Sequence, residues 1–117
     1  MNERRKKTRR RTPCQTAVFD SNTGEHLGWV VNITCEGIML RGEEALNADH
    51  IYDLRIELPD PIKGHSRLDV RAHSLWCQRS VDPAYYNTGL ELVEVPAHVN
   101  AVIELLVRDA VFQRWVS

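Results

Sequence analysis

The chain has 117 residues, a length typical of one domain with a single hydrophobic core, and its 43% hydrophobic and 26% charged residues are typical of globular proteins. Its net charge of −1 conceals an asymmetry, because seven of the 15 Lys and Arg lie in Arg4–Arg11 whereas 15 of the 16 Asp and Glu follow Thr12. No stretch approaches the ~20 apolar residues of a membrane helix, and no apolar run follows the charged N-terminus as it would in a secretory signal.

Residues 1–12 carry the basic run and show no apolar periodicity. Repulsion between like charges predicts a flexible basic arm here. From Pro13 onward, short apolar stretches predict strands at 16–19 ("TAVF") and 26–33 ("HLGWVVNI"), joined by the turn-like "DSNTG". A short strand punctuated by glycines, "GIMLRG", follows.

Two longer stretches alternate between apolar and polar residues and predict half-buried strands. In "IYDLRIELP" one face is formed by Tyr52, Leu54, Ile56 and Leu58, and Pro59 is expected to end the strand. In "RLDVRAHSLWCQ" the shared face is formed by Leu68, Val70, Ala72, Ser74 and Trp76. A loop, "SVDPAYYN", and a further strand, "TGLELVEV", complete the β region.

After Pro96 the apolar period becomes helical. It predicts a C-terminal helix over 96–115, with apolar residues at Val99, Val102, Ile103, Leu106, Ala110, Phe112 and Trp115. Pro96 fits the first turn, where its missing N–H costs nothing. About six strands and one helix favour a mainly β fold, an antiparallel barrel or sandwich, in which 13–117 form one domain behind the arm.

The cysteines and histidines do not form a recognisable site. Cys14, Cys35 and Cys77 are odd in number and widely spaced, which argues against a disulfide framework and favours a reducing cytoplasm. No C-x-x-C or H-x-x-x-H spacing predicts a metal site. The serines lie in no nucleophile-elbow sequence and no pair of carboxylates stands out, so we expect no catalytic residues and no enzyme activity.

Two short polar motifs remain. Arg5 and Arg9 form R-x-x-x-R within the arm, and Asn32, Thr34 and Gly37 form N-x-T-x-x-G between two predicted strands. Each motif alone has an ordinary explanation, because basic tails are common and all three residues of the second motif favour turns. The glycine-rich motifs that bind phosphates are missing, so side chains would have to hold any nucleotide.

Taken in this order, and followed by "SLW", "TGLELVEV" and a helix, the two motifs resemble a PilZ domain over essentially the whole chain. The resemblance implies a six-stranded antiparallel β-barrel that binds the bacterial second messenger cyclic di-GMP as a ligand. It implies that Arg5, Arg9, Asn32, Thr34 and Gly37 contact this ligand, with Thr34 standing where the family usually has Ser.

Two further residues match positions with a role in some family members. Arg4, just before the first motif arginine, resembles members that take up a stacked pair of cyclic di-GMP molecules. Trp76 matches an aromatic position that borders the ligand in some members. The alternative for Trp76 is a core position on its alternating strand.

These residue types suit that ligand. The planar fork of arginine binds a phosphate, or O6 and N7 of guanine, in a bidentate manner, and it also stacks on flat rings. Asn32 and Thr34 offer short hydrogen-bonding groups, and Gly37 would let the backbone turn and approach the ligand without a Cβ. Binding would order the arm against the barrel and change the surface seen by a separate effector protein.

Two alternatives stay open. The arm could bind nucleic acid, although the chain from Thr12 onward has a net charge of −7 and the arm lacks aromatic residues for stacking. Alternatively, the chain could be a PilZ-like protein-interaction module that acts without ligand.

Overall fold

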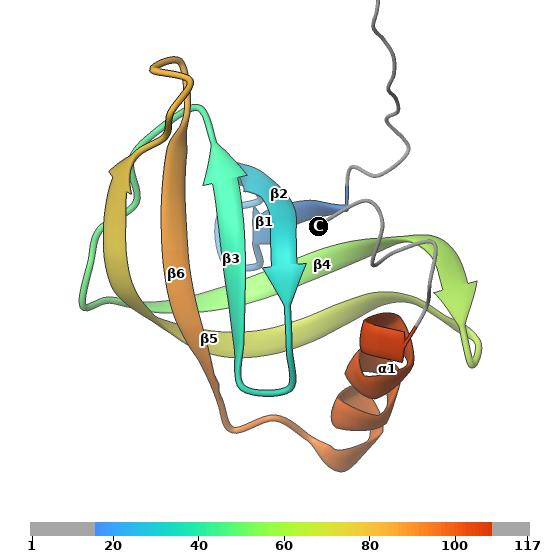
Figure 1. Cartoon of the computed structure of the whole chain (residues 1–117). Coiled ribbons are helices and arrows are strands. Elements are labelled where there is room, and N and C mark those ends of the chain that lie inside the picture. Colours follow the sequence, from blue (N-terminus) through green and yellow to red (C-terminus); the bar gives the residue numbers. More distant parts are fainter. Residues whose placement is uncertain (1–15, 109–117) are drawn as a thin grey trace, which may run out of the picture.

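The computed structural model describes residues 16–108, which form a closed barrel of six antiparallel strands followed by one helix (Figure 1). The elements are β1 (Ala17–Asp20), β2 (His26–Ile33), β3 (Gly37–Gly42), β4 (Ile51–Ile62), β5 (His65–Arg79), β6 (Tyr86–Val93) and α1 (Ala97–Arg108). The expected mainly β fold is confirmed, as a barrel rather than a sandwich. The expected arm at 1–12 and the expected helix residues after Arg108 lie outside the described residues.

The strands follow the order β1-β2-β3-β6-β5-β4, and β4 pairs with β1 to close the barrel. Strands that follow one another in the chain pair as hairpins, except β3 and β4. After β3 the chain crosses the barrel and forms β4 and β5, so that β3 pairs with β6 instead. The β3–β6 pairing brings the strand after the second polar motif beside residues some fifty positions later in the chain.

The β4–β5 hairpin corrects one prediction, because β4 does not end at Pro59 but continues to Ile62. The paired residues shift from Glu57↔Arg67 to Ile62↔His65, so Pro59 lies in an irregular stretch where its missing N–H breaks no ladder bond. Lys63 and Gly64 then turn the chain with positive φ angles of 51° and 81°, as a two-residue type I′ turn requires.

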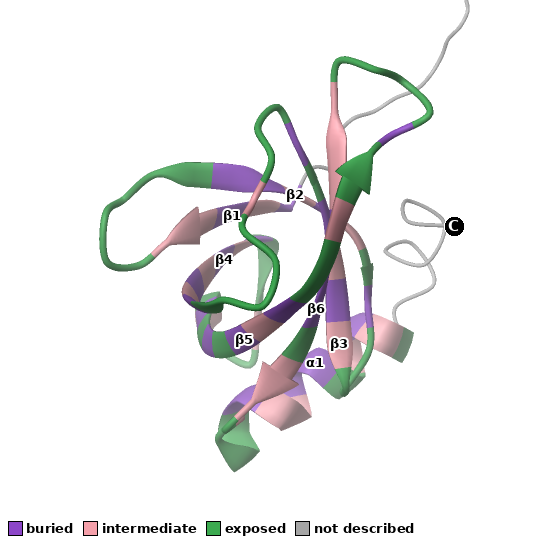
Figure 2. Cartoon of the chain, turned by 90° about the vertical axis from the view of Figure 1, so that its left-hand side faces the viewer, coloured by how far each residue is buried: buried purple, intermediate pink, exposed green. Residues whose placement is uncertain are grey.

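Inward-facing side chains of the strands fill the barrel, and buried and exposed residues alternate along most strands (Figure 2). The face of β4 predicted from alternation is buried, at Tyr52, Leu54, Ile56 and Leu58. The helix α1 lies beside one end of the barrel (Figure 1) and adds four residues to the same core, Val99, Val102, Ile103 and Leu106. No helix within 16–108 is long and apolar enough to cross a membrane.

Candidate ligand-binding face

The turn between β2 and β3 is organised by the hydroxyl of Thr34. Its Oγ1 accepts hydrogen bonds from the backbone N–H groups of Glu36 (3.2 Å) and Gly37 (3.1 Å). The backbone N–H of Thr34 donates to the carbonyl of Gly37 at 2.8 Å. A Ser or Thr side chain that accepts bonds from the following turn is a common turn device. Thr34 therefore shapes the turn that carries the N-x-T-x-x-G motif.

The hydroxyl hydrogen of Thr34 is less firmly engaged. The carbonyl of Gly37 lies 3.5 Å from Oγ1, which is long for an O–H donor. Asn32 is exposed at the end of β2, and a bulge between Val30 and Asn32 shifts the register with β3 just before the motif. Both motif side chains therefore lie at the surface, next to the same turn.

Gly37 has a different role from the one expected. Its φ angle is not in the left-handed region, so the turn does not need glycine for its backbone conformation. Instead, a Cβ at this position would lie 2.9 Å from the carbonyl oxygen of Leu90 on β6. Real Cβ contacts are essentially never that short, so Gly37 permits the close approach of β3 and β6.

Trp76 lies outside the core, contrary to the strict alternation that the sequence suggests. Ala72 and Ser74 of β5 are fully buried, but a bulge between Ser74 and Trp76 shifts the register with β6 and leaves Leu75 as the extra residue. Trp76 is consequently 38% exposed. Its indole lies over Gly89 of β6, where an added Cβ would clash with the ring.

The barrel places Trp76 in line with the polar motif. Strand pairing joins Asn32 to Met39, Met39 to Gly89, and Gly89 to Trp76 in one row across β2, β3, β6 and β5. We call these four residues the outer row. Three inter-strand spacings, about 14 Å measured along the curved wall of the barrel, lie between its two ends. Thr34 and Gly37 lie in the turn that follows Asn32.

The outer row brings together two of the predicted site residues and adds two that the sequence did not single out. Met39 lies between the buried Ile38 and Leu40, so alternation alone could have assigned it to the outside. Nothing local marks Gly89, because its role depends on the indole of a different strand. Arg4, Arg5 and Arg9 lie outside the described residues.

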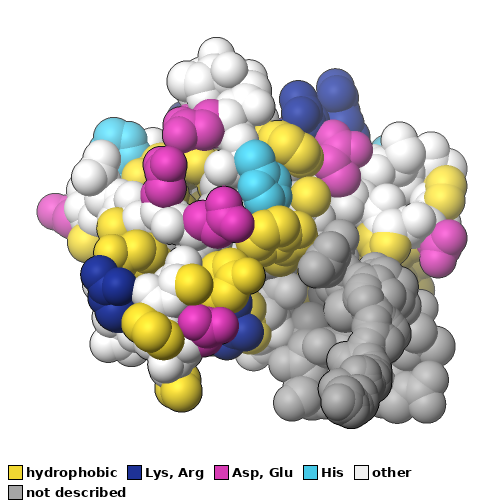
Figure 3. Space-filling view, turned by 90° about the horizontal axis from the view of Figure 1, so that it is seen from above, with side chains coloured by type: hydrophobic (Ala, Val, Ile, Leu, Met, Phe, Trp, Pro, Cys, Tyr) yellow, Lys and Arg dark blue, Asp and Glu magenta, His cyan; other side chains and the backbone are white. Residues whose placement is uncertain are grey.

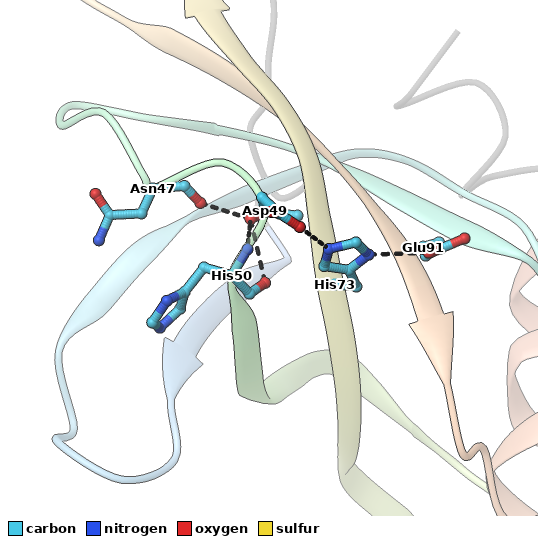
Figure 4. Close-up of polar contacts among 6 residues, drawn as sticks. Asn47, Asp49, His50, His73 and Glu91 are labelled. Carbon is cyan, nitrogen blue, oxygen red and sulfur yellow. Dashed lines mark hydrogen bonds and ion pairs between the residues drawn. The ribbon is translucent and has the colours of Figure 1, made fainter.

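Next to the outer row, His73 of β5 links two carboxylates (Figure 4). Its Nε2 lies 2.7 Å from Oδ1 of Asp49, in the β3–β4 connection, and its Nδ1 lies 3.0 Å from Oε2 of Glu91 on β6. A neutral imidazole donates only one hydrogen bond, so both contacts are satisfied only by the protonated ring. Glu91 and then Asp49 raise the pKa of His73 above its ordinary value of 6.5.

The β3–β4 connection is also attached to β5 by a buried serine. The hydroxyl of Ser74 donates to the backbone carbonyl of Asn47 (2.5 Å) and accepts from the N–H of His50 (3.0 Å). The backbone N–H of Asp49 donates to the carbonyl of Ser74 at 2.7 Å. Ser74 is therefore a structural residue, and it holds Asp49 within reach of His73.

The end of the barrel that is uppermost in Figure 1 is acidic and in part hydrophobic. Seen from above, Asp and Glu are scattered among hydrophobic side chains, and Lys and Arg are few (Figure 3). Within 16–108 no group of His, Cys, Asp and Glu side chains is arranged to hold a metal ion.

Comparison with known proteins identifies a similar fold. The chain is similar to the solved structure of the Bacillus subtilis inhibitor of motility MotI/DgrA, with a TM-score of 0.63 and 20% sequence identity. The similarity covers 83% of this chain and 47% of the other, so this chain spans about half the length of that protein. No protein-family model matches the chain, and no curated protein sequence does. The likeness shows the fold.

Proposed function

We propose that this chain is a cyclic di-GMP receptor that acts on a separate effector protein. The observation that carries the proposal is the outer row, which connects Asn32, beside the Thr34 turn, to Trp76 across the outside of the barrel. The R-x-x-x-R motif of the arm supplies the second part of the resemblance to PilZ domains. The solved neighbour with this fold is an inhibitor of motility, and a regulatory rather than catalytic role is in line with that.

The chemistry of each group matches one part of the ligand. The exposed indole of Trp76 offers a face on which a guanine stacks, and Asn32 offers an amide to a base edge or phosphate. The hydroxyl hydrogen of Thr34 is available to an acceptor because its contact with Gly37 is long. Arg5 and Arg9 would close over the ligand from the other side, and Arg4 would favour a stacked pair.

A ligand-dependent change in the arm would then alter what a partner protein contacts. In this proposal the arm packs on the barrel when the ligand is bound, so the ligand favours one of two arrangements of the same chain. The partner is a protein, and the ligand remains a signal that is bound and released rather than a cofactor of catalysis.

The test is a calorimetric titration of the full chain with cyclic di-GMP, alongside Arg5→Ala and Arg9→Ala. Lys6→Ala is the matched control, because it removes the same charge from the same arm at a variable position of the motif. Loss of one bidentate arginine should weaken binding by about 1–3 kcal/mol, roughly 5- to 150-fold. The control should bind nearly as well as the unmodified chain.

The fitted stoichiometry tests the role of Arg4. Two ligands per chain, falling to one in Arg4→Ala, would support a stacked pair. Absence of binding by the unmodified chain, found by calorimetry and by a second method, would contradict the receptor function.

In that case a ligand-independent interaction module becomes the better explanation. Its specific support is a group of exposed apolar side chains at one end of β5 and the loop after it, Leu75, Trp76 and Val81. Such side chains are typical of protein-contact surfaces. A module of this kind would bind its partner equally well with and without cyclic di-GMP.

A further inference from the structure

Arg41 is an exposed arginine on β3, two residues after Met39, so its side chain lies on the same outer face as the outer row. Strand pairing places Trp29 of β2 on one side of it and Asn87 of β6 on the other. Its Nε–H donates to Oδ1 of Asn87 at 3.2 Å. Within 16–108 its two terminal nitrogens, Nη1 and Nη2, have no hydrogen-bond partner.

The other strand arginines are engaged differently. Three of them lie close to carboxylates, in the pairs Arg55–Glu57 (2.8 Å), Arg67–Asp69 (3.7 Å) and Arg71–Asp53 (2.9 Å). Arg79 uses both terminal nitrogens inside the β5–β6 hairpin, on the carbonyl of Pro83 and the hydroxyl of Tyr86. Among the described strands, Arg41 is therefore the arginine that a neutral amide orients while its terminal nitrogens stay available.

The position of Arg41 relative to Trp76 suits a ligand that lies across β6. Trp76 covers Gly89 from the β5 side, and Asn87 is the next outward-facing residue of β6. Arg41 approaches β6 from the β3 side, two strand spacings or about 10 Å from β5. A ligand that stacks on the indole and extends across β6 would bring a phosphate toward Arg41.

We propose that Arg41, oriented by Asn87, is a further phosphate-binding residue of this face. This assignment rests on the proposed function and names a residue outside both motifs. The guanidinium edge formed by Nη1 and Nη2 can donate two parallel hydrogen bonds to one phosphate group. Because the barrel is acidic, a cation already in place would also offset repulsion between the barrel and the dinucleotide.

The experiment measures cyclic di-GMP affinity of the full chain and of Arg41→Gln at several salt concentrations. Arg67→Gln is the matched control, since it removes the same charge from an exposed strand arginine that already lies near Asp69. Arg41→Gln should weaken binding roughly 10- to 150-fold, as expected for a lost charge-assisted hydrogen bond. It should also make the affinity less sensitive to salt, because salt screens the attraction between the guanidinium and a phosphate.

Asn87→Ala separates orientation from direct contact with the ligand. Its loss should be smaller than that of Arg41→Gln, and the double variant should bind no worse than Arg41→Gln alone. Arg41→Lys retains the charge without the planar fork, so its affinity should fall between the two. Circular dichroism checks that each variant keeps the fold.

The outcomes distinguish this assignment from the function on which it rests. If the unmodified chain, Arg41→Gln and Arg41→Lys all bind cyclic di-GMP with the same affinity, Arg41 does not hold a phosphate. The receptor function stands in that case. If losses from Arg41→Gln and Asn87→Ala simply add, Asn87 contacts the ligand itself and does not act through Arg41. If the unmodified chain does not bind, the receptor function is wrong and the assignment of Arg41 falls with it.

Discussion

The outer surface of the barrel has two faces with contrasting chemistry. On the ion-pair face, formed by β4 and the first half of β5, three successive cross-strand pairs are oppositely charged: Asp53↔Arg71, Arg55↔Asp69 and Glu57↔Arg67. Opposite charges directly across two strands stabilise the pairing. Arg71, with Asn22, holds the pKa of Asp53 below its ordinary value, so that carboxyl stays ionised at neutral pH.

The candidate ligand-binding face, formed by β2, β3, β6 and the end of β5, has no such pairing of charges along the outer row. The outer row there consists of the amide of Asn32, the thioether of Met39, the backbone of Gly89 and the indole of Trp76. The Arg41–Asn87 pair lies beside it. One face satisfies its own charges, whereas the other leaves planar and polar groups available. Under the proposed function, the first face serves the fold and the second binds the ligand.

Removal of the indole should separate the two faces most clearly. Trp76→Ala should weaken cyclic di-GMP binding by about 1–3 kcal/mol, because stacking of one base on an aromatic side chain contributes that much. Arg71→Gln on the ion-pair face should leave affinity unchanged and lower stability only slightly, as is usual for exposed ion pairs. Calorimetric titration and urea denaturation of both variants provide the measurements.

A loss of affinity in Arg71→Gln without a loss in Trp76→Ala would contradict the contrast between the faces. Equal losses of affinity would mean that binding does not distinguish the two faces. If Trp76→Ala kept full affinity, the indole would not contact the ligand.

The Thr34 turn should show a smaller effect, on stability. Thr34→Val keeps the shape of the side chain but removes the oxygen that accepts from Glu36 and Gly37. It should lower the free energy of unfolding by about 1 kcal/mol, and Thr34→Ser should preserve it. Urea denaturation measures both, and equal midpoints for Val and Thr would show that the hydroxyl does not hold the turn.

The His73 link should produce the smallest effect, seen as a dependence on pH. Because its folded-state pKa is raised, its contribution to stability is complete below pH 6.5 and is lost as pH rises through the folded-state pKa. His73→Gln should flatten stability across this window. The titration of the His73 ring by NMR reports the pKa directly, and a value at or below 6.5 would contradict the bridging geometry.

Much of the local structure could be predicted from the sequence. Alternation assigned Leu54, Ile56 and the other inward residues of β4 correctly, because side chains of a strand alternate between its faces wherever the pairing is regular. The helical period after Pro96 likewise predicted α1 and its buried face. The order of the two motifs indicated where on the chain a ligand site should be sought.

The exceptions occur where pairing between strands becomes irregular. Pro59 was expected to end β4, yet the strand continues beyond it through a shift in register. Trp76 had a core position as its alternative, yet a second shift in register leaves it exposed. A bulge depends on how two strands fit together, so a single strand's pattern does not reveal it. The roles of Gly37 and Gly89 similarly depend on an atom or ring from another strand. The amino-acid sequence by itself thus determined the strands, the helix and the motif residues. Only the pairing of β3 with β6 connected Asn32, Arg41 and Trp76 across adjacent strands on the outside of the barrel, because that pairing joins segments distant in the chain.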